Sequence, residues 1–373
     1  ARSLGRKVGV KILERHPALQ EIHGYKPNDF GSIVAAAALA HDIGNPPFGH
    51  SGEKAIGHFF KNGLGQNFKS ELSAKQYQDL CDFEGNANGF KILTQDLKGR
   101  PGGLRLSYST LGAFTKYPKA SLPKRPTPHI VSKKYGFFQS EATMFREVAK
   151  ELGLLKMNRD DDSQFSRHPL AYLVEAADDI CYTIIDFEDG INLGLIDEDF
   201  ALEYLINLVR NKIQTKKYSA LPTTSSRVSY LRALAIGTLI DDAVDIFVRN
   251  EKSLLDGSFQ VALIDKSQYK TQIDDIIKIS IDRIYNAKEV IDKEISGFEV
   301  INELLLRFTT AVNNSYANKA SHYDRLLLKL LPSELDILNQ NLYERLMAVC
   351  GVVASYSDSN AILTYKKLKG LTF

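Results

Sequence analysis

A nearly all-apolar segment that ends in a histidine and an aspartate constrains this chain more than any other feature. Residues 32–40 contain one serine and eight apolar residues, and His41-Asp42 follows directly. The apolar run predicts a buried helix. Burial of the two polar side chains without partners costs roughly 2–7 kcal/mol for the neutral group and more for the charge. A divalent cation bound by both residues at the helix end would satisfy them.

The alternative interpretation is that the histidine is a satisfied core residue and the aspartate a helix cap. The residues that follow favour the metal interpretation. Gly44 and the pair Pro46-Pro47 predict a tight, rigid turn. His50 and Glu53 then lie three positions apart at the start of the next helix and share one face. The segment therefore predicts a metal pair beside a histidine–carboxylate pair suited to acid–base chemistry.

A long stretch from Leu97 to Ser140 contains no acidic residue and interleaves aromatic residues with basic ones. Its nine positive charges are Lys98, Arg100, Arg105, Lys116, Lys119, Lys124, Arg125, Lys133 and Lys134. This pattern suits a polyphosphate with a stacking base, or a nucleic-acid strand. The alternative is a solvated basic loop, which we expect for the outer positions Lys119, Lys124 and Arg125.

Composition fits a soluble helical protein. The chain has 373 residues, of which 44% are hydrophobic and 25% charged, and its net charge is +2. The three cysteines have no short spacing, which argues against a disulfide framework or a zinc–thiolate site and favours a reducing, cytoplasmic location. No apolar run of about eighteen residues exists, so no membrane span is expected.

Periodicity predicts helices along most of the chain, with short strands at 102–106 and 258–264. The expected helices cover 2–16, 31–44, 51–62, 72–80, 85–94, 107–116, 139–152, 168–187, 198–213, 225–250, 271–293, 297–315 and 341–368. We therefore expect an all-α globule with irregular loops. It would form a single domain, 1–373, with the active-site core in 1–200 and a helical part, 201–373, for packing and oligomerisation.

Several motifs resemble one enzyme family. His41-Asp42 resembles the doublet of HD-domain metal phosphohydrolases, and AHDIGNPPFGHSGE at 40–53 resembles the dGTPase type of deoxynucleoside triphosphate triphosphohydrolase. Further matching segments follow in the same order along the chain: FEGNAN at 83–88, LSYSTL at 106–111, KYP at 116–118, KKYGFF at 133–138 and EAADDI at 175–180. The resemblance implies an HD-domain fold and metal-dependent hydrolysis of a dNTP to deoxynucleoside and tripolyphosphate.

The resemblance also implies a set of metal ligands. His41, Asp42 and Asp178 match three of the four protein ligands of such enzymes. The fourth is an upstream histidine that lies before Ala1, so we interpret the chain as N-terminally truncated. The expected cofactor is a divalent metal, Mg²⁺ or Mn²⁺, although another transition metal also fits histidine and carboxylate ligands.

Spacing places Asp178, Tyr182 and Asp186 on one stripe of a helix, at i, i+4 and i+8. By this interpretation Asp178 meets the metal, Tyr182 contacts a sugar or phosphate, and Asp186 accepts a bond from a sugar hydroxyl. Asp179 points about 100° away from this stripe and is expected to be structural or to support the metal ligands without contacting the metal. The alternative is a solvated acidic face, which the mostly apolar composition of this helix disfavours.

The expected chemistry assigns proton transfer to His50, with Glu53 orienting and charging it. The expected substrate contacts are Asn45, Asn86, Lys116, Tyr117, Lys134, Tyr182 and Asp186. The expected partners are a dNTP substrate, a dNTP effector at a second site, single-stranded DNA and further copies of the chain in a hexamer or tetramer.

Two other functions stay open from the residues. One is an HD-type nucleotidase or phosphodiesterase, which would release orthophosphate rather than tripolyphosphate. The other is a nucleotide- or single-strand-binding regulator with weak turnover, which the long acid-free basic stretch favours.

Overall fold

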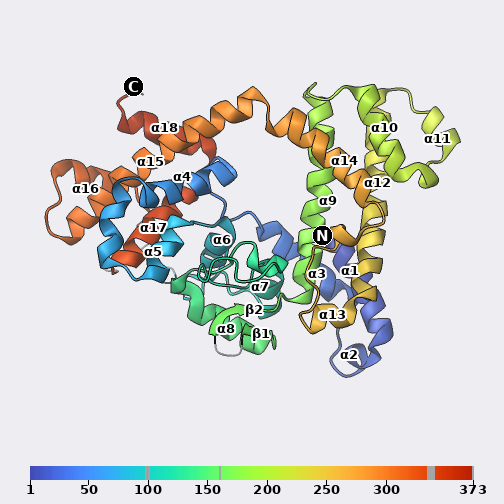
Figure 1. The fold of residues 1–373 in the computed structure, drawn as a ribbon, viewed down its shortest axis with the longest axis horizontal. Coiled ribbons are helices and arrows are strands. Elements are labelled where there is room, and N and C mark those ends of the chain that lie inside the picture. Colours follow the sequence, from blue (N-terminus) through green and yellow to red (C-terminus); the bar gives the residue numbers. More distant parts are fainter. Residues whose placement is uncertain (97–98, 100, 159–160, 334–340, 372–373) are drawn as a thin grey trace. The chain divides into compact units, whose positions relative to one another are not determined.

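The computed structural model describes residues 1–373 except 97–98, 100, 159–160, 334–340 and 372–373 (Figure 1). The regular secondary structure of the described chain is helical apart from one antiparallel pair of short strands, β1 (Lys156–Asn158) and β2 (Asp161–Phe165). The expectation of an all-α fold is therefore confirmed. The strands expected at 102–106 and 258–264 are wrong, since both segments form turns or irregular structure. Gly102 and Gly103 adopt positive φ angles, which a strand does not accommodate.

The described chain folds as two compact units, each assembled from separate segments. Unit 1 comprises residues 1–39, 112–116 and 167–290, and unit 2 comprises residues 40–111, 117–166 and 291–373. Each unit therefore contains a part of the sequence that carries the predicted site. The assignment of one domain over 1–373 stays a prediction.

Unit 1 is built around two long helices. Its α-helices are α1 (Arg2–Arg15), α2 (Pro17–Glu21), α3 (Pro27–Ala40), α9 (Pro169–Asn192), α10 (Glu198–Val209), α11 (Thr215–Ser219), α12 (Thr224–Arg249), α13 (Glu251–Leu255) and α14 (Lys270–Ser280). Short 3₁₀ turns lie at 210–212 and 264–266, and a π turn, η6 (Ile281–Tyr285), continues α14.

Helices α9 and α12 run side by side and form the core of unit 1 (Figure 1). Helices α1 and α10 pack on α12, and α14 packs on α9. Helix α9 buries Leu173, Ala176, Ile180 and Ile184, an apolar face that recurs every three or four residues. The EAADDI motif lies in the middle of this helix, so its acidic residues project from a rigid element.

Unit 2 contains the remaining helices and the strand pair. Its helices are α4 (Gly49–Lys61), α5 (Ala74–Cys81), α6 (Gly85–Thr94), α7 (Tyr108–Phe114, whose last three residues belong to unit 1), α8 (Ala142–Glu151), α15 (Lys288–Tyr316, whose first three residues belong to unit 1), α16 (His322–Leu328), α17 (Leu342–Ala354) and α18 (Asp358–Leu368). The 3₁₀ helices are η1 (Leu64–Glu71), η2 (Ile130–Ser132) and η3 (Gln139–Glu141).

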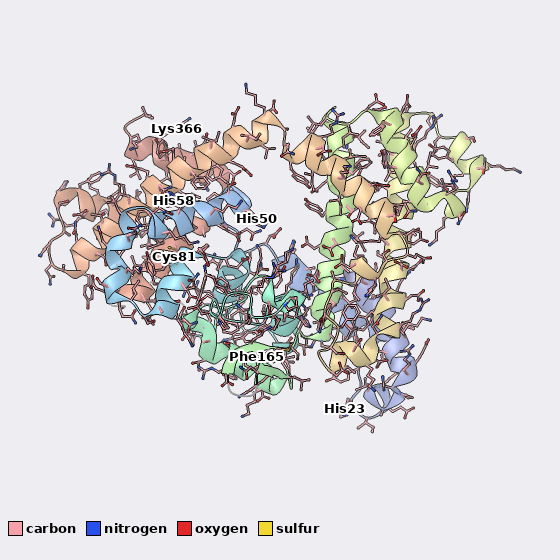
Figure 2. All side chains as sticks on the ribbon, viewed as in Figure 1. His23, His50, His58, Cys81, Phe165 and Lys366 are labelled. Atoms are coloured by element: carbon pink, nitrogen blue, oxygen red, sulfur yellow. The ribbon has the colours of Figure 1, made fainter. Side chains whose placement is uncertain are left out.

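The core of unit 2 lies among α4, α15 and α17. Phe60, Leu304, Phe308 and Met347 are completely buried there. The core fixes α4, which carries His50 near its start and His58 near its end (Figure 2). Burying an aromatic or aliphatic side chain of this size contributes about 1.5–3 kcal/mol, so the core holds the site-bearing helix firmly.

Several expected helices end or break at other residues than predicted. The helix expected at 31–44 ends at Ala40, and it is buried on one face only, through Gly31, Val34 and Ala37. Leu39 is 90% exposed, so the expectation of a wholly buried helix is wrong.

The helix expected over 271–293 is interrupted at residues 286–287, between the π turn and α15. The helix expected over 341–368 is two helices, α17 and α18, that meet at an angle of 111°. The break follows from local capping, because the Ser357 hydroxyl accepts a hydrogen bond from the Asn360 N–H and starts a new helix.

Among the described residues, no helix by itself has the length and apolar composition to span a membrane. The bent pair α17–α18 meets the same criteria only when its two helices are taken together. Helix α17 is mostly buried in the core of unit 2.

Candidate functional site

The loop after α3 lies directly against the first turn of α6. A Cβ atom on Gly44 would lie 2.1 Å from the Gly85 carbonyl oxygen and 2.1 Å from the Gly89 nitrogen. The Asn88 side-chain amide donates a hydrogen bond to the Gly44 carbonyl at 2.9 Å. Glycine is therefore required at residue 44 by close backbone approach. This contact fixes the loop that begins with His41-Asp42.

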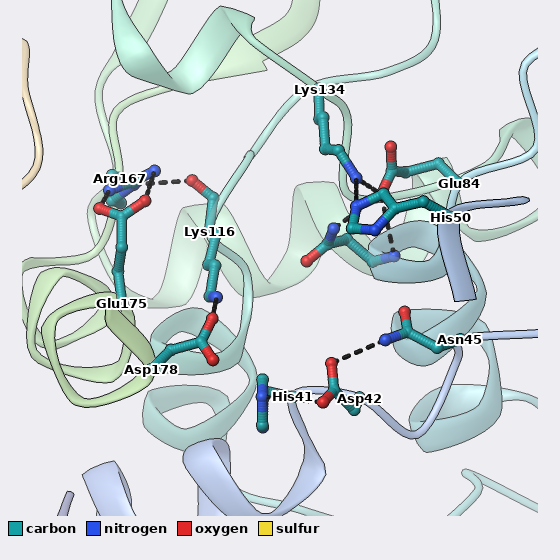
Figure 3. A network of polar contacts seen from close by, with 11 residues as sticks. His41, Asp42, Asn45, His50, Glu84, Lys116, Lys134, Arg167, Glu175 and Asp178 are labelled. Atoms are coloured by element: carbon teal, nitrogen blue, oxygen red, sulfur yellow. Dashed lines mark hydrogen bonds and ion pairs between the residues drawn. The ribbon is translucent and has the colours of Figure 1, made fainter. Parts of the chain in front are cut away.

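The histidine and aspartate of the doublet face one another. His41 Nε2 lies 3.0 Å from Asp42 Oδ2, and the Asn45 side-chain amide donates to Asp42 Oδ1 at 2.7 Å (Figure 3). The side chains of His41 and Asp42 are 27% and 65% exposed, respectively. The doublet therefore presents an imidazole nitrogen and a carboxylate oxygen at one accessible point, with the carboxylate oriented by the neighbouring asparagine.

The start of α4 is anchored by Phe48, whose φ of 64° is in the left-handed region. Its N–H donates to Asp358 Oδ1 at 2.9 Å. Its ring lies so close to Gly297 that a Cβ there would be 2.7 Å from Phe48 Cγ. These contacts set the direction of α4, whose first two turns carry His50 and Glu53 as the sequence predicts.

One lysine of unit 2 contacts two carboxylates and a histidine. Figure 3 shows its contacts with Glu84 and His50. Lys134 Nζ lies 3.1 Å from Glu84 Oε1, 3.3 Å from His50 Nε2 and 3.7 Å from Glu53 Oε2. We call these four residues the shared-lysine cluster. An ammonium group has no acceptor, so His50 accepts at Nε2 when Lys134 is charged, which places the imidazole in its neutral form.

Burial raises the pKa of Glu53 to about 7, and repulsion by Glu84 adds to this effect. Lys134 and the Gly85 N–H, which donates to Glu53 Oε1 at 2.7 Å, act in the opposite direction. Burial and the nearby Lys134 lower the pKa of His50. A carboxyl that titrates near neutral pH next to a neutral imidazole is an arrangement suited to proton transfer.

Unit 1 holds a second charged cluster with a different arrangement (Figure 3). Lys116 Nζ pairs with Asp178 Oδ2 at 2.5 Å, and Arg167 Nη1 pairs with Glu175 Oε2 at 2.5 Å. Arg167 Nε also donates to the Lys116 carbonyl oxygen at 2.7 Å. We call these four residues the paired-ion cluster. The arginine ties the backbone of the lysine to α9, where both carboxylates lie.

The Arg167 side chain is fully buried, and its guanidinium lies 4.6 Å from the centre of the Tyr172 ring. This placement combines an ion pair with a cation–π contact. Burial and repulsion by Glu175 raise the pKa of Asp179 to about 7. Asp179 is half-buried beside Asp178, and its structural role stays a prediction.

Tyr182 and Asp186, in the C-terminal half of α9, contact Tyr285 of the π turn η6. The rings of Tyr182 and Tyr285 stack with centroids 5.4 Å apart and planes 4° from parallel. The Tyr285 hydroxyl donates to Asp186 Oδ2, and burial raises the pKa of Tyr285 well above its ordinary value. Both residues expected to contact a sugar are therefore held by one tyrosine.

No model of a known protein family matches this chain. Individual relatives do match over most of its length. A deoxyguanosinetriphosphate triphosphohydrolase-like protein of Synechocystis is 36% identical over 100% of this chain and 83% of its own length. A protein of the same description from Pseudomonas aeruginosa is 34% identical over 99% of this chain and 83% of its own length. The chain belongs to the deoxyguanosinetriphosphate triphosphohydrolase-like family.

A relative from Yersinia enterocolitica, described as deoxyguanosinetriphosphate triphosphohydrolase, is 30% identical over 81% of this chain and 66% of its own length. The family resemblance drawn from the motifs is confirmed. The expectation of an enzyme that hydrolyses phosphoric ester bonds is likewise confirmed at the level of the family.

Within this family frame, each unit brings together some of the residues predicted from sequence. Unit 2 gathers His50, Glu53 and Lys134 in the shared-lysine cluster, with Asn86 donating to Glu84 at 2.7 Å. Unit 1 pairs Lys116 with Asp178 and joins Tyr182 and Asp186 through Tyr285. Tyr117 is buried in unit 2.

Sequence reasoning missed three residues that organise these contacts: Glu84, Arg167 and Tyr285. Glu84 lies inside the FEGNAN motif, so its place in that motif was an available signal. Arg167 precedes the EAADDI motif by eight residues, just before the helix begins, and no local pattern marks it. Tyr285 is 99 residues from the aspartate it contacts, a separation that no periodicity reveals.

The expectation that Lys119 belongs to a solvated basic loop is wrong. Its residue is 2% exposed, its Nζ donates to the Ala120 carbonyl at 2.6 Å, and burial lowers its pKa to about 8. Lys124 is exposed and pairs with Asp82 at 2.6 Å, and Arg125 is exposed as expected. Lys98 and Arg100 lie outside the described residues.

The doublet fits a divalent cation by its donor chemistry and spacing. Two ligand atoms about 2.1 Å from one ion and at right angles lie about 3 Å apart, as His41 Nε2 and Asp42 Oδ2 do at 3.0 Å. Among the residues that the structure describes, no group of three or more histidine, cysteine or acidic side chains forms a metal-binding cluster. The doublet alone offers one imidazole nitrogen and one carboxylate oxygen to a cation.

Proposed function

We propose that this protein hydrolyses dGTP, and other deoxynucleoside triphosphates, to the deoxynucleoside and tripolyphosphate. The main support is the shared-lysine cluster, whose residue His50 follows the His41-Asp42 doublet closely in the chain. The chain also aligns along its full length with a deoxyguanosinetriphosphate triphosphohydrolase-like relative. The name of that relative supplies the substrate, and the cluster supplies groups suited to the reaction.

The proposed ligands of a divalent cation are His41, Asp42 and Asp178, together with the upstream histidine that the family resemblance implies. The spacing of the doublet supports the first two. The place of Asp178 in the EAADDI motif supports the third. A bound Mg²⁺, Mn²⁺ or related ion polarises a phosphoryl oxygen and lowers the pKa of a coordinated water.

His50 is the proposed proton carrier. Its neutral imidazole can take a proton from attacking water or pass one to the leaving oxygen. Glu53, three residues along the same helix, holds its own proton near neutral pH and can orient and charge this histidine when ionised. General acid–base help of this kind contributes about 10²–10⁴-fold to the rate.

The proposed contacts to the substrate divide by chemistry. Lys116 and Lys134 are cations that can neutralise triphosphate oxygens as negative charge shifts in the transition state. Asn45 and Asn86 offer amide donors, and each amide is already oriented by a neighbouring carboxylate.

The remaining proposed contacts are to the sugar. Tyr117 and Tyr182 provide aromatic faces and hydroxyls, and Asp186 can accept a bond from a sugar hydroxyl. Because Tyr285 holds both Tyr182 and Asp186, a sugar that takes the aspartate replaces the tyrosine hydroxyl as its donor.

The test replaces His41 or Asp42 by Ala in the full-length protein, and measures bound metal, helical content and dGTP hydrolysis. We expect both variants to stay folded while they lose metal and lose turnover. Unchanged turnover in either variant would contradict the proposal. Product analysis distinguishes the chemistry, since tripolyphosphate supports it and orthophosphate favours the nucleotidase or phosphodiesterase alternative.

The expectations of a dNTP effector, of single-stranded DNA binding and of a hexamer or tetramer stay predictions. The charge distribution bears on the DNA interface. Of the basic residues in the acid-free stretch, Lys116, Lys124 and Lys134 pair with carboxylates within their own units and Lys119 is buried. Among the described residues there, Arg105, Lys124, Arg125 and Lys133 are exposed, and Lys124 is already paired with Asp82. Of these described residues, Arg105, Arg125 and Lys133 would be the ones that a DNA interface uses.

A further inference from the structure

Glu84 accepts three hydrogen bonds from residues of the candidate site. Its Oε1 atom accepts hydrogen bonds from Lys134 Nζ at 3.1 Å, from Asn86 Nδ2 at 2.7 Å and from the Asn86 backbone N–H at 3.4 Å. The residue is 7% exposed and caps the first turn of α6. One buried carboxylate thus holds both a cation and an amide of the proposed phosphate-binding set.

We infer that Glu84 is a positioning residue that holds Lys134 and Asn86 in place for the triphosphate and sets the charge balance around His50 and Glu53. This inference rests on the proposed function for the reaction that it assists. It adds a role for a residue that neither the metal doublet nor the acid–base pair explains.

The contacts of Lys134 show why its position depends on Glu84. The distance from Lys134 Nζ to Glu84 is 3.1 Å, compared with 3.7 Å to Glu53. Loss of the Glu84 charge leaves Glu53 as the nearest carboxylate to the lysine among these contacts, so the ammonium would be drawn towards α4. The Asn86 amide would also lose the acceptor that fixes its direction.

The charge of Glu84 acts on both members of the acid–base pair. Glu53 faces Glu84 and Lys134, and His50 faces Lys134, Glu84, Lys54 and Asp42. Glu84 raises the pKa of Glu53 and of His50. Its removal therefore lowers both pKa values, so the active protonation state persists to lower pH.

The test compares Glu84→Gln and Glu84→Asp with the wild-type full-length protein. In Glu84→Gln the amide oxygen keeps an acceptor but the charge is lost. We expect KM for dGTP to rise about tenfold, as for loss of a hydrogen bond to a charged group, and the acid limb of kcat to shift down by about half a pH unit or more. In Glu84→Asp the charge stays, so we expect the acid limb of kcat to stay at the wild-type pH. KM should still rise, because the shorter side chain moves the acceptor oxygen away from Lys134 and Asn86.

Glu141→Gln is the matched control. Glu141 is a buried carboxylate of the same unit that pairs with Lys91 at 3.0 Å and is not among the groups that shift the pKa of His50 or Glu53. We expect this variant to lose thermal stability without moving the acid limb. A Glu84→Gln enzyme with wild-type KM and pH profile overturns the inference, and so does an equal shift in Glu141→Gln.

A readout without substrate separates this inference from the proposed function. NMR titration of the His50 ring in the free protein should give a lower pKa in Glu84→Gln than in the wild type. If the wild-type protein does not hydrolyse dGTP, the proposed function fails, and this titration still decides whether Glu84 sets the charge of the cluster. If the wild type hydrolyses dGTP but His50 titrates identically in both proteins, the inference about Glu84 alone fails.

Discussion

In the paired-ion cluster of unit 1, Asp178 and Glu175 each have a cation of their own, whereas in the shared-lysine cluster of unit 2 one lysine serves two carboxylates and a histidine. One-to-one pairs neutralise charge and hold geometry. A shared cation leaves an excess of negative charge, so burial and repulsion by a neighbouring carboxylate can keep one carboxyl protonated near neutral pH. Glu53 shows this result, with a pKa of about 7.

The difference suggests a division of labour. Arg167 pairs with Glu175 and fixes the backbone of Lys116 against α9, so this ion pair supports the structure around Asp178. The shared-lysine cluster holds a neutral imidazole and a carboxyl that titrates near pH 7, an arrangement that suits the proton transfer proposed above. The following substitutions test this division, beginning with the one that should change the protein most.

The largest effect should come from His50→Ala in the shared-lysine cluster. We expect kcat for dGTP to fall by about 10²–10⁴-fold, the usual contribution of general acid–base catalysis, while metal content stays constant. Steady-state kinetics and metal analysis measure the two quantities. His58→Ala, on the exposed side of the same helix, is the matched control and should keep wild-type turnover. Loss of metal from His50→Ala would show that His50 is a ligand rather than a proton carrier.

The second effect concerns the paired-ion cluster. Arg167→Met leaves the buried Glu175 carboxylate without its cation, so we expect the free energy of unfolding to fall by about 3–5 kcal/mol. Urea unfolding measures this loss. The double variant Arg167→Met/Glu175→Gln should recover part of it because the stranded charge is gone. A single variant as stable as wild type would mean that this ion pair does not support the unit.

The third substitution should increase folding stability, because it removes an unfavourably buried charge from the shared-lysine cluster. The pKa of Glu53 is raised from 4.5 to about 7 in the folded protein. Folding is therefore favoured by this group below pH 4.5, and that stability is lost as pH rises through 7. Glu53→Gln avoids the loss and should be more stable than wild type by on the order of 1–3 kcal/mol above pH 7.

The advantage of Glu53→Gln should disappear below pH 4.5, where the wild-type carboxyl is protonated in both states. Thermal or urea unfolding across this pH range measures it. If Glu53→Gln is less stable than wild type at pH 8, the Glu53 charge stabilises the fold as the one-to-one pairs do. The contrast between the two clusters would then be wrong.

The smallest effect should come from Tyr285→Phe in unit 1. The ring can still stack on Tyr182, but the hydrogen bond to Asp186 is lost, so we expect a loss of about 0.5–1.5 kcal/mol in unfolding free energy. Tyr25→Phe, at an exposed tyrosine of the same unit, serves as the control and should be neutral. Equal stabilities of the two variants would show that the Tyr285 hydroxyl contributes nothing to the fold.

Local patterns predicted the helices well where capping and periodicity agree. The helix expected at 85–94 is observed as α6 with the same bounds, and Glu84 caps its start. The break at residues 286–287 escaped prediction because apolar residues continue at helical spacing through the π turn. Lys119 escaped because its burial depends on a bridge to Gln164, 45 residues away in the chain.

The helical class, the family and the loop that carries His41 and Asp42 can be predicted from the amino-acid sequence alone, since apolar periodicity and contiguous motifs involve residues close together in the chain. Which polar groups meet follows from the fold: Lys134 contacts Glu84 and His50, and Arg167 contacts the Lys116 backbone. Such pairings depend on distance in space between residues tens of positions apart, and their energies depend on how much water is excluded. Neither quantity is encoded in the spacing of residues along the chain.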